Sequence, residues 1–142
     1  MKEVNTGATP PGILRRLASM CYDLLLIFAI LIVFLIFPHV LIAYFAQRFA
    51  TTNGLWLHLF LVLLVYFNGF WCYGGQTVAM KTWRIRLVSR NGNPVRPAQA
   101  LLRYLLCWPS LALGGIGILW AIFDRDGQFL HDRIAGTKLI TA

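Results

Sequence analysis

The stretch LASMCYDLLLIFAILIVFLIF, residues 17–37, decides the fold. Its 21 residues carry one charge, that of Asp23. At a rise of about 1.5 Å per residue, a helix of this length is about 31 Å long and crosses the hydrocarbon core of a bilayer. We therefore expect a transmembrane helix here, which Pro38 either ends or kinks, so that residues 40–46 continue it.

Two further apolar runs follow the first one. Residues 55–73 form a second expected span, separated from the first by the short polar turn 47–54. The third run lies within residues 97–123 and is broken in its middle by a proline and three glycines. It is either one kinked span or two short helices, 97–108 and 111–123, that meet at Pro109. Each short helix would be about 18 Å long, too short to cross, so the pair would be re-entrant or interfacial.

The composition agrees with a membrane protein. Of 142 residues, 58% are hydrophobic and 13% are charged, and the mean hydropathy is +0.67. Soluble domains average about 45–50% apolar and about 25% charged residues, and a chain this short could not bury the excess. We expect one domain over residues 1–142, an all-α integral membrane protein with two full spans and a third, broken segment.

The distribution of cations predicts the orientation in the membrane. Of the 13 Lys and Arg residues, three lie in residues 1–16, one in the turn 47–54, six in residues 74–104 and three in the tail 124–142. The positive-inside rule then places the N-terminus and residues 74–104 in the cytoplasm. A re-entrant third segment keeps the tail inside as well, and we favour it. The net charge of +8 indicates contact with anionic lipid headgroups, and we expect no nucleic-acid partner.

Two stretches outside the apolar runs have the pattern of strands. Residues 83–88 alternate apolar and polar side chains, and residues 137–141 are the other strand-like stretch. If both lie on the cytoplasmic side, they can pair into a small β-ribbon that ties the tail back. A tail on the far side of the membrane could not form this pair.

Asp23 is the most informative polar residue, because a carboxylate inside a span is costly and often functional. Arg16 lies seven residues earlier and therefore on the same helix face, about 10.5 Å away along the axis. Asn68 lies at matching depth in the second span, so we expect it to hydrogen-bond Asp23. Asp132 and Arg133 are the candidate partners of the Arg16–Asp23 pair from another segment.

The remaining polar residues favour ordinary structural roles. We interpret His39 and His58 as polar side chains at the membrane interface rather than as a proton relay. We interpret His131 as part of a turn or an ion pair rather than as a pH sensor. Cys21, Cys72 and Cys107 have no disulfide or metal spacing. We expect no metal site, no cofactor and no enzymatic activity.

Several short motifs across residues 12–141 together resemble one known family. They are Arg15-Arg16-Leu17-Ala18, Asp23, Gly75-Gln76-Thr77, the arginine-rich stretch 83–88, Ala100-Leu101-Leu102-Arg103 and Leu130-His131-Asp132-Arg133-Ile134-Ala135-Gly136-Thr137. The chain resembles the RDD family of small bacterial membrane proteins, which is named for one arginine and two aspartates. By position these are Arg16 (or Arg15), Asp23 and Asp132, with Asp124 as the competing second aspartate. Ala79 departs from the family, which often has glycine there.

The resemblance implies a multi-pass protein of the bacterial inner membrane that transports small ions, by monovalent cation/proton exchange. Asp23 would be the proton site, and Arg16 and Asp132 would hold the cytoplasmic mouth. Two spans and a broken segment cannot easily enclose a pathway, so a homo-oligomer or a larger membrane complex is expected. The alternative is a non-catalytic accessory or scaffold protein that binds a partner protein or anionic headgroups, with these three residues as structural locks.

Overall fold

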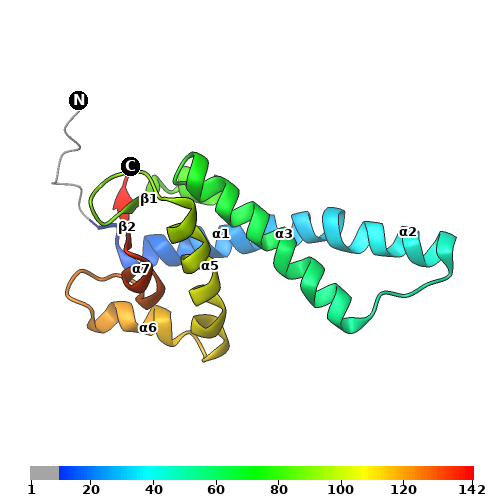
Figure 1. The fold of residues 1–142 in the computed structure, drawn as a ribbon. Coiled ribbons are helices and arrows are strands. Elements are labelled where there is room, and N and C mark those ends of the chain that lie inside the picture. The colour runs from blue at the N-terminus through cyan, green and yellow to red at the C-terminus, as the bar shows by residue number, and fades with distance from the viewer. Residues whose placement is uncertain (1–9) are drawn as a thin grey trace.

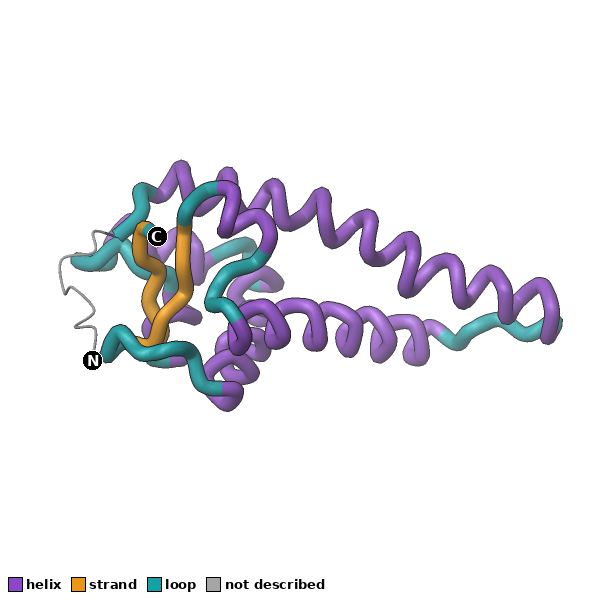
Figure 2. The backbone as a smooth tube through the Cα atoms, turned by 90° about the horizontal axis from the view of Figure 1, so that it is seen from above, coloured by secondary structure: helices purple, strands orange, loops and turns teal. Residues whose placement is uncertain are grey.

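The computed structural model describes residues 10–142. Figures 1 and 2 show two long helices that project together from a smaller body, which contains the strands and the C-terminus. We call the projecting pair the helical hairpin and residues 74–142 the head. The two helices of the hairpin, Ile13–Ala46 and Thr52–Tyr73, are each long and apolar enough to cross a membrane.

The first long helix runs through the predicted Pro38 break. It consists of α1 (Ile13–Leu31), the π-helical turn η1 (Ile32–Ile36) and α2 (Phe37–Ala46). Proline lacks an N–H and its ring collides with a carbonyl one turn earlier, and the wider π turn just before Pro38 accommodates both. The helix ends at Gln47, whose φ of 51° is left-handed.

The second long helix, α3 (Thr52–Tyr73), begins three residues earlier than predicted. Thr51 caps it, because its Oγ1 accepts a hydrogen bond from the Gly54 N–H at 3.2 Å. Most of the hairpin is exposed apolar surface: the most hydrophobic stretch of the first helix has no buried residue, and that of α3 has 6%. A helix whose apolar side chains face outward all round suits a lipid environment.

The broken third segment bends by 96° between α5 (Pro97–Ala112) and α6 (Ile116–Phe123). The expected break at Pro109 is wrong, because Pro109 lies inside α5. The chain turns instead at Gly114 and Gly115, whose φ angles of 74° and 80° are open to glycine and strained for other residues.

The predicted β-ribbon is confirmed. Strand β1 (Ile85–Ser89) pairs antiparallel with β2 (Thr137–Thr141), so that Ile85 faces Thr141 and Ser89 faces Thr137. The tail therefore returns to the segment that follows α3, as the re-entrant form of α5–α6 requires. Two short helices of the head were not predicted: α4 (Val78–Thr82) and α7 (Leu130–Ala135).

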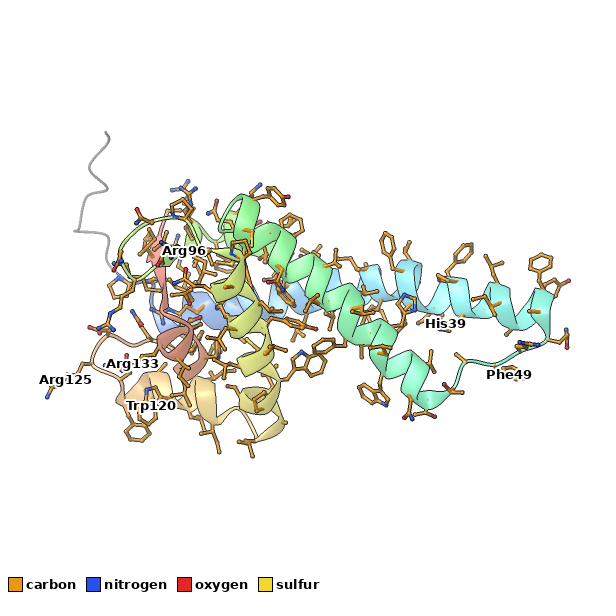
Figure 3. The ribbon with its side chains drawn as sticks, in the orientation of Figure 1. His39, Phe49, Arg96, Trp120, Arg125 and Arg133 are labelled. Atoms are coloured by element: carbon orange, nitrogen blue, oxygen red, sulfur yellow. The ribbon has the colours of Figure 1, made fainter. Side chains whose placement is uncertain are left out.

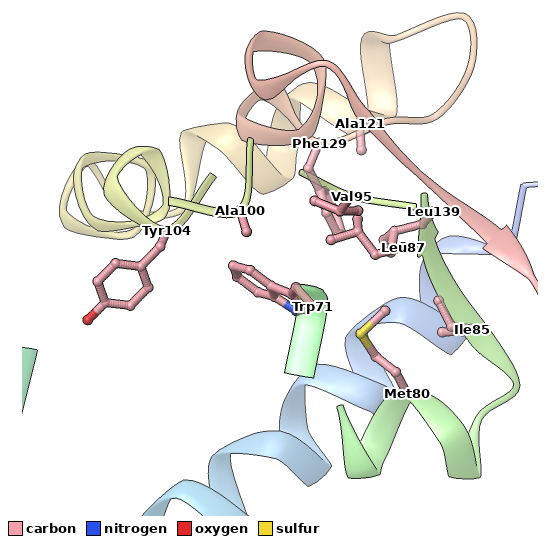
Figure 4. Packing of buried hydrophobic residues seen from close by; sticks show 10 residues of the cluster. All are labelled: Trp71, Met80, Ile85, Leu87, Val95, Ala100, Tyr104, Ala121, Phe129 and Leu139. Atoms are coloured by element: carbon pink, nitrogen blue, oxygen red, sulfur yellow. The ribbon is translucent and has the colours of Figure 1, made fainter. Parts of the chain in front are cut away.

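The buried core lies in the head and at the adjoining end of α3. It unites Trp71 from α3, Ile85 and Leu87 from β1, Tyr104 from α5 and Phe129 before α7. Figure 4 shows these side chains, which come from elements that are far apart in sequence; the Tyr104 ring points away from the others. This core holds together the elements that carry the polar residues described next.

Candidate functional site

One face of α1 is polar and buried against the head. Arg16, Ser19 and Asp23 are its three buried residues, at the i, i+3 and i+7 spacing of one helix face. The expectation that Arg16 and Asp23 share a face is confirmed. Arg15 is only half-buried, so Arg16 is the arginine that faces the head.

Two hydroxyl groups hold the Asp23 carboxylate. Thr77 Oγ1 donates a hydrogen bond to Asp23 Oδ2 at 2.8 Å, and Tyr66 OH donates to Oδ1 at 3.4 Å. The side chain of Asp23 thus links α1 to α3 and to the start of α4, where Thr77 Oγ1 also caps the helix by accepting from the Met80 N–H at 3.2 Å. The carboxylate is surrounded by oxygen atoms from two other elements.

The expected hydrogen bond between Asn68 and Asp23 is wrong. Asn68 Nδ2 donates instead to the Leu64 carbonyl of its own helix at 3.0 Å. Depth alone had suggested the pair, but Tyr66, two residues earlier, faces Asp23. Two residues of helix correspond to a rotation of about 200°, so Asn68 points the other way.

The second aspartate, Asp132, is paired with a residue that the sequence did not single out. Arg103 Nε donates to Asp132 Oδ1 in a short ion pair. Asp132 is 1% exposed and Arg103 is 6% exposed. The guanidinium also lies over the Trp71 ring, 4.3 Å from its centroid, so Arg103 joins α5 to both α7 and α3.

Arg16 reaches the same cluster from α1. Its Nη1 donates to the Gly127 carbonyl, and its guanidinium lies 5.6 Å from the centroid of the Phe129 ring. Among the described residues Arg16 makes no ion pair with its predicted partner Asp132, and Asp23 takes hydroxyl partners and not Arg133.

His131 is buried beside the Arg103–Asp132 pair. Its Nε2 lies 3.8 Å from Asp132 Oδ1, and its ring stacks on Phe129 with 5.4 Å between centroids. The pKa of His131 is lowered to about 4, chiefly by burial; the negative charge of Asp132 opposes this shift and the positive charge of Arg103 adds to it. His131 is therefore neutral near pH 7, so the ion-pair half of its predicted role is wrong, whereas its place in the short helix α7 agrees with a structural role.

Arg133 and Asp124 form a separate pair at the surface of the head. Arg133 Nη1 donates to Asp124 Oδ1, and Asp124 Oδ2 accepts from the Gln128 N–H at 2.9 Å. The Gln128 hydrogen bond and the charge of Arg133 lower the pKa of Asp124. Asp124, the competing second aspartate, thus closes the loop after α6 and lies outside the buried cluster.

Three of the residues that contact the two aspartates were not predicted from the sequence: Tyr66, Thr77 and Arg103. Arg103 was counted among the cations of residues 74–104 and quoted in the motif Ala100-Leu101-Leu102-Arg103, but no partner was predicted for it. Thr77 ends Gly75-Gln76-Thr77, so the motif was a usable signal. Nothing in the sequence distinguishes Tyr66 from the other tyrosines of the chain.

An open groove of about 510 Å³ runs along α3 beside the Asp23 site. Tyr66 is among its lining residues, together with Val65, Gly69, Tyr73, Gln76 and Lys81. The same Tyr66 contacts the groove and donates its hydroxyl proton to Asp23. Asp23 itself does not line the groove, so Tyr66 is the residue that the groove and the carboxylate share.

A sequence model of the RDD family matches residues 10–136. The chain belongs to the RDD family. The match covers Arg16, Asp23, Asp132 and the Arg103 that pairs with Asp132. In this RDD protein Arg16, Asp23 and Asp132, the residues that the resemblance pointed to, are all buried.

A curated relative of this RDD protein is the "Uncharacterized protein RP437" of Rickettsia prowazekii (strain Madrid E). The two are 34% identical over 80 residues, which is 56% of this chain and 44% of the relative. The matched region thus spans less than half of the relative's length. No solved structure matches the chain significantly.

Proposed function

We propose that this RDD protein exchanges protons for monovalent cations across the bacterial inner membrane, and that Asp23 is the site that binds both. One observation carries the proposal. Asp23, the single acidic residue in the two long helices, is bound by the Thr77 and Tyr66 hydroxyls and by no cation within hydrogen-bond distance among residues 10–142.

The chemistry of this site suits exchange. Carboxylate and hydroxyl oxygens are hard donors of the kind that Na⁺ and other hard cations bind. A proton and a cation compete for the same carboxylate, so binding of one releases the other. Ionisable residues within spans are functional sites by default because their insertion is costly.

Two features near Asp23 could serve the passage of ions: a groove and a buried cluster of charged residues. The groove along α3 reaches Tyr66, and the cluster of Arg16, Arg103 and Asp132 lies where α1 meets the head. Two helices with outward apolar faces do not enclose a pathway, so the working unit is proposed to be a homo-oligomer or a larger complex.

The proposed orientation places the N-terminus and the head in the cytoplasm. It rests on the distribution of Lys and Arg, of which the turn 47–54 has only one. It also rests on the pairing of β1 with β2, which keeps the tail on the same side as residues 85–89. An Ala142→Cys variant without the three native cysteines tests it. Labelling of residue 142 in intact cells by an impermeant thiol reagent would overturn this orientation.

Exchange is tested with purified protein in liposomes that contain a pH-sensitive dye. A pulse of Na⁺ or K⁺ outside should change the internal pH with wild type and not with Asp23→Asn. Asp126→Asn is the matched control, because it removes an exposed carboxylate from the head. Exchange that continues in a folded Asp23→Asn variant with unchanged pH dependence would refute the mechanism.

A second candidate is an accessory protein that binds anionic headgroups or a partner protein. The observation in its favour is that Arg84, Arg86, Arg90 and Arg96 are all exposed on one part of the head; Figure 3 labels Arg96 there. Under this candidate, Asp23→Asn lowers the yield of folded protein and changes no flux. A stoichiometric partner that copurifies in mild detergent, together with inactive wild-type liposomes, would favour it.

A further inference from the structure

We infer that His39 and His58 form a binding site for one divalent transition-metal ion, such as Zn²⁺, Ni²⁺ or Cu²⁺. The site lies in the helical hairpin, near the end opposite the head. It does not depend on the proposed exchange function, because Asp23 lies 16 residues before His39, about 24 Å away along the helix.

The two imidazoles face each other across the hairpin. His39 lies in α2 and His58 in α3, and their ring centroids are 5.0 Å apart with 44° between the ring planes. His39 precedes the end of α2 by seven residues, and His58 follows the start of α3 by six. In Figure 3 His39 lies on the hairpin, well away from the labelled arginines of the head.

The hydrogen bond of His39 prepares one nitrogen for a metal. Its Nδ1 lies 2.7 Å from the Leu35 carbonyl oxygen. A carbonyl only accepts, so Nδ1 carries the proton and the lone pair is on Nε2. Metal-ligating histidines commonly donate their other N–H to a backbone carbonyl in this way, which fixes both tautomer and ring orientation. Leu35 lies in the π-helical turn η1, a type of turn frequent at functional sites.

The separation of the rings fits a shared ion. Two imidazole nitrogens at about 2.0–2.1 Å from one tetrahedral Zn²⁺ place the ring centroids about 5 Å apart. The observed 5.0 Å therefore needs little movement of either helix. His58 makes no hydrogen bond with the part of the chain that the structure describes, so its ring is free to turn a nitrogen towards the ion.

Imidazole selects the class of ion. Zn²⁺, Ni²⁺ and Cu²⁺ prefer nitrogen donors, whereas Ca²⁺ and Mg²⁺ prefer oxygen. Across residues 10–142 no group of three or more His, Cys, Asp or Glu side chains is placed to hold a metal. The protein therefore supplies two ligands, and water takes the remaining positions. Both histidines are half-buried, which leaves the ion partly accessible.

The test is direct measurement of metal binding by the full chain in detergent, purified with a tag that has no histidine. Zn²⁺ and Ni²⁺ are titrated by calorimetry into wild type, His39→Gln, His58→Gln and the double variant. Leu57→Gln is the matched control, since it adds the same amide next to His58 at an exposed position and keeps both imidazoles. Asp23→Asn serves as a second control.

Wild type, Leu57→Gln and Asp23→Asn should bind the metal alike. Each histidine variant should bind about 10- to 100-fold more weakly, or not at all, and Ca²⁺ should not bind at this pair. The inference is wrong if folded wild type binds neither Zn²⁺ nor Ni²⁺, or if removing either histidine leaves the affinity unchanged. Circular dichroism checks that each variant is folded. Retained metal binding in an Asp23→Asn variant that has lost exchange separates this site from the proposed function.

Discussion

Arg103 and Asp132 form a buried ion pair that joins α5 to α7. Neither side chain has another oppositely charged partner at ion-pair distance among the described residues, because the adjacent His131 is neutral near pH 7. The pair is shielded from water by the core that surrounds Trp71. A buried pair of this kind is costly to break, because the remaining charge has no solvent to stabilise it.

Removing one member of the pair should therefore destabilise the head strongly. We expect Arg103→Met or Asp132→Asn to lower the free energy of unfolding by about 3–5 kcal/mol. Arg133→Met breaks the pair with Asp124, in which the arginine side chain is 49% exposed and the carboxylate keeps its hydrogen bond from the Gln128 N–H, so it should cost only about 1 kcal/mol. Detergent-solubilised variants can be compared by denaturant titration, and equal losses for Arg103→Met and Arg133→Met would contradict the central place of Arg103.

Asp23 accepts a hydrogen bond from Tyr66 and not from Asn68, so substitutions of these two residues should differ in their effect on stability. Tyr66→Phe removes a donor from a buried carboxylate and should destabilise the contact between α1 and α3 by about 1–3 kcal/mol. Asn68→Leu removes only a bond to the backbone of its own helix and should be nearly neutral. Melting temperatures of the two variants measure the difference, and a larger loss for Asn68→Leu would support the original depth-based pairing.

Much of the architecture could be predicted from the sequence, because hydrophobicity and charge act locally. The two long helices follow from uninterrupted apolar runs, and the β-ribbon from the period-two pattern of residues 83–88. Arg16 and Asp23 could be placed on one face because helical geometry fixes their angular relation. Each of these inferences needs only a few turns of chain.

The predictions failed where a contact depends on rotation or tertiary packing. Depth in the membrane could not tell which way Asn68 points. Pro109 read as the break in the third segment, but two consecutive left-handed glycines end α5 five residues later. The sequence does not show that α7 packs against α5, so Arg103 was counted as a cytoplasmic cation and its ion pair with Asp132 was not predicted. The hydroxyl partner of Asp23 on Thr77 comes from 54 residues away.

Two glycines near the end of α3 should respond oppositely to the same substitution. Gly75 has a φ of 67°, and a Cβ there would lie 2.5 Å from the Leu87 carbonyl oxygen of β1. We expect Gly75→Ala to cost about 1–2 kcal/mol or more, through left-handed strain and that clash. Gly69→Ala is the control, because no atom lies within 4 Å of the added Cβ, and alanine should raise helix stability by up to about 1 kcal/mol.

Thermal melts of the Gly75→Ala and Gly69→Ala variants in detergent show whether each substitution lowers or raises the stability of the protein. The close approach is also marked by the hydrogen bond from the Leu87 N–H to the Gly75 carbonyl at 2.7 Å. A tolerated alanine at 75 would mean that β1 can move away from the end of α3 without loss. A destabilising alanine at 69 would indicate that this face of α3 is packed, as in an oligomer.

His131 should make the stability of the head depend on pH. Its pKa is lowered from 6.5 to about 4 in the folded protein, so the unfolded chain takes up a proton first as the pH falls. Stability from the neutral imidazole is therefore complete above about pH 6.5 and declines towards pH 4, with a loss of about 2 kcal/mol at pH 5. The groups that face the ring are Phe129, Asp132 and Arg103.

A His131→Phe variant keeps an aromatic ring against Phe129 and cannot titrate. Melting temperatures of wild type and variant should run parallel between pH 7 and 8. Below about pH 6.5 the wild-type curve should fall more steeply, because only wild type loses the imidazole contribution. The lowered pKa of Asp124 adds a loss at still lower pH that both proteins share. Parallel curves down to pH 4.5 would mean that His131 binds its proton equally well folded and unfolded, which its burial beside Arg103 opposes.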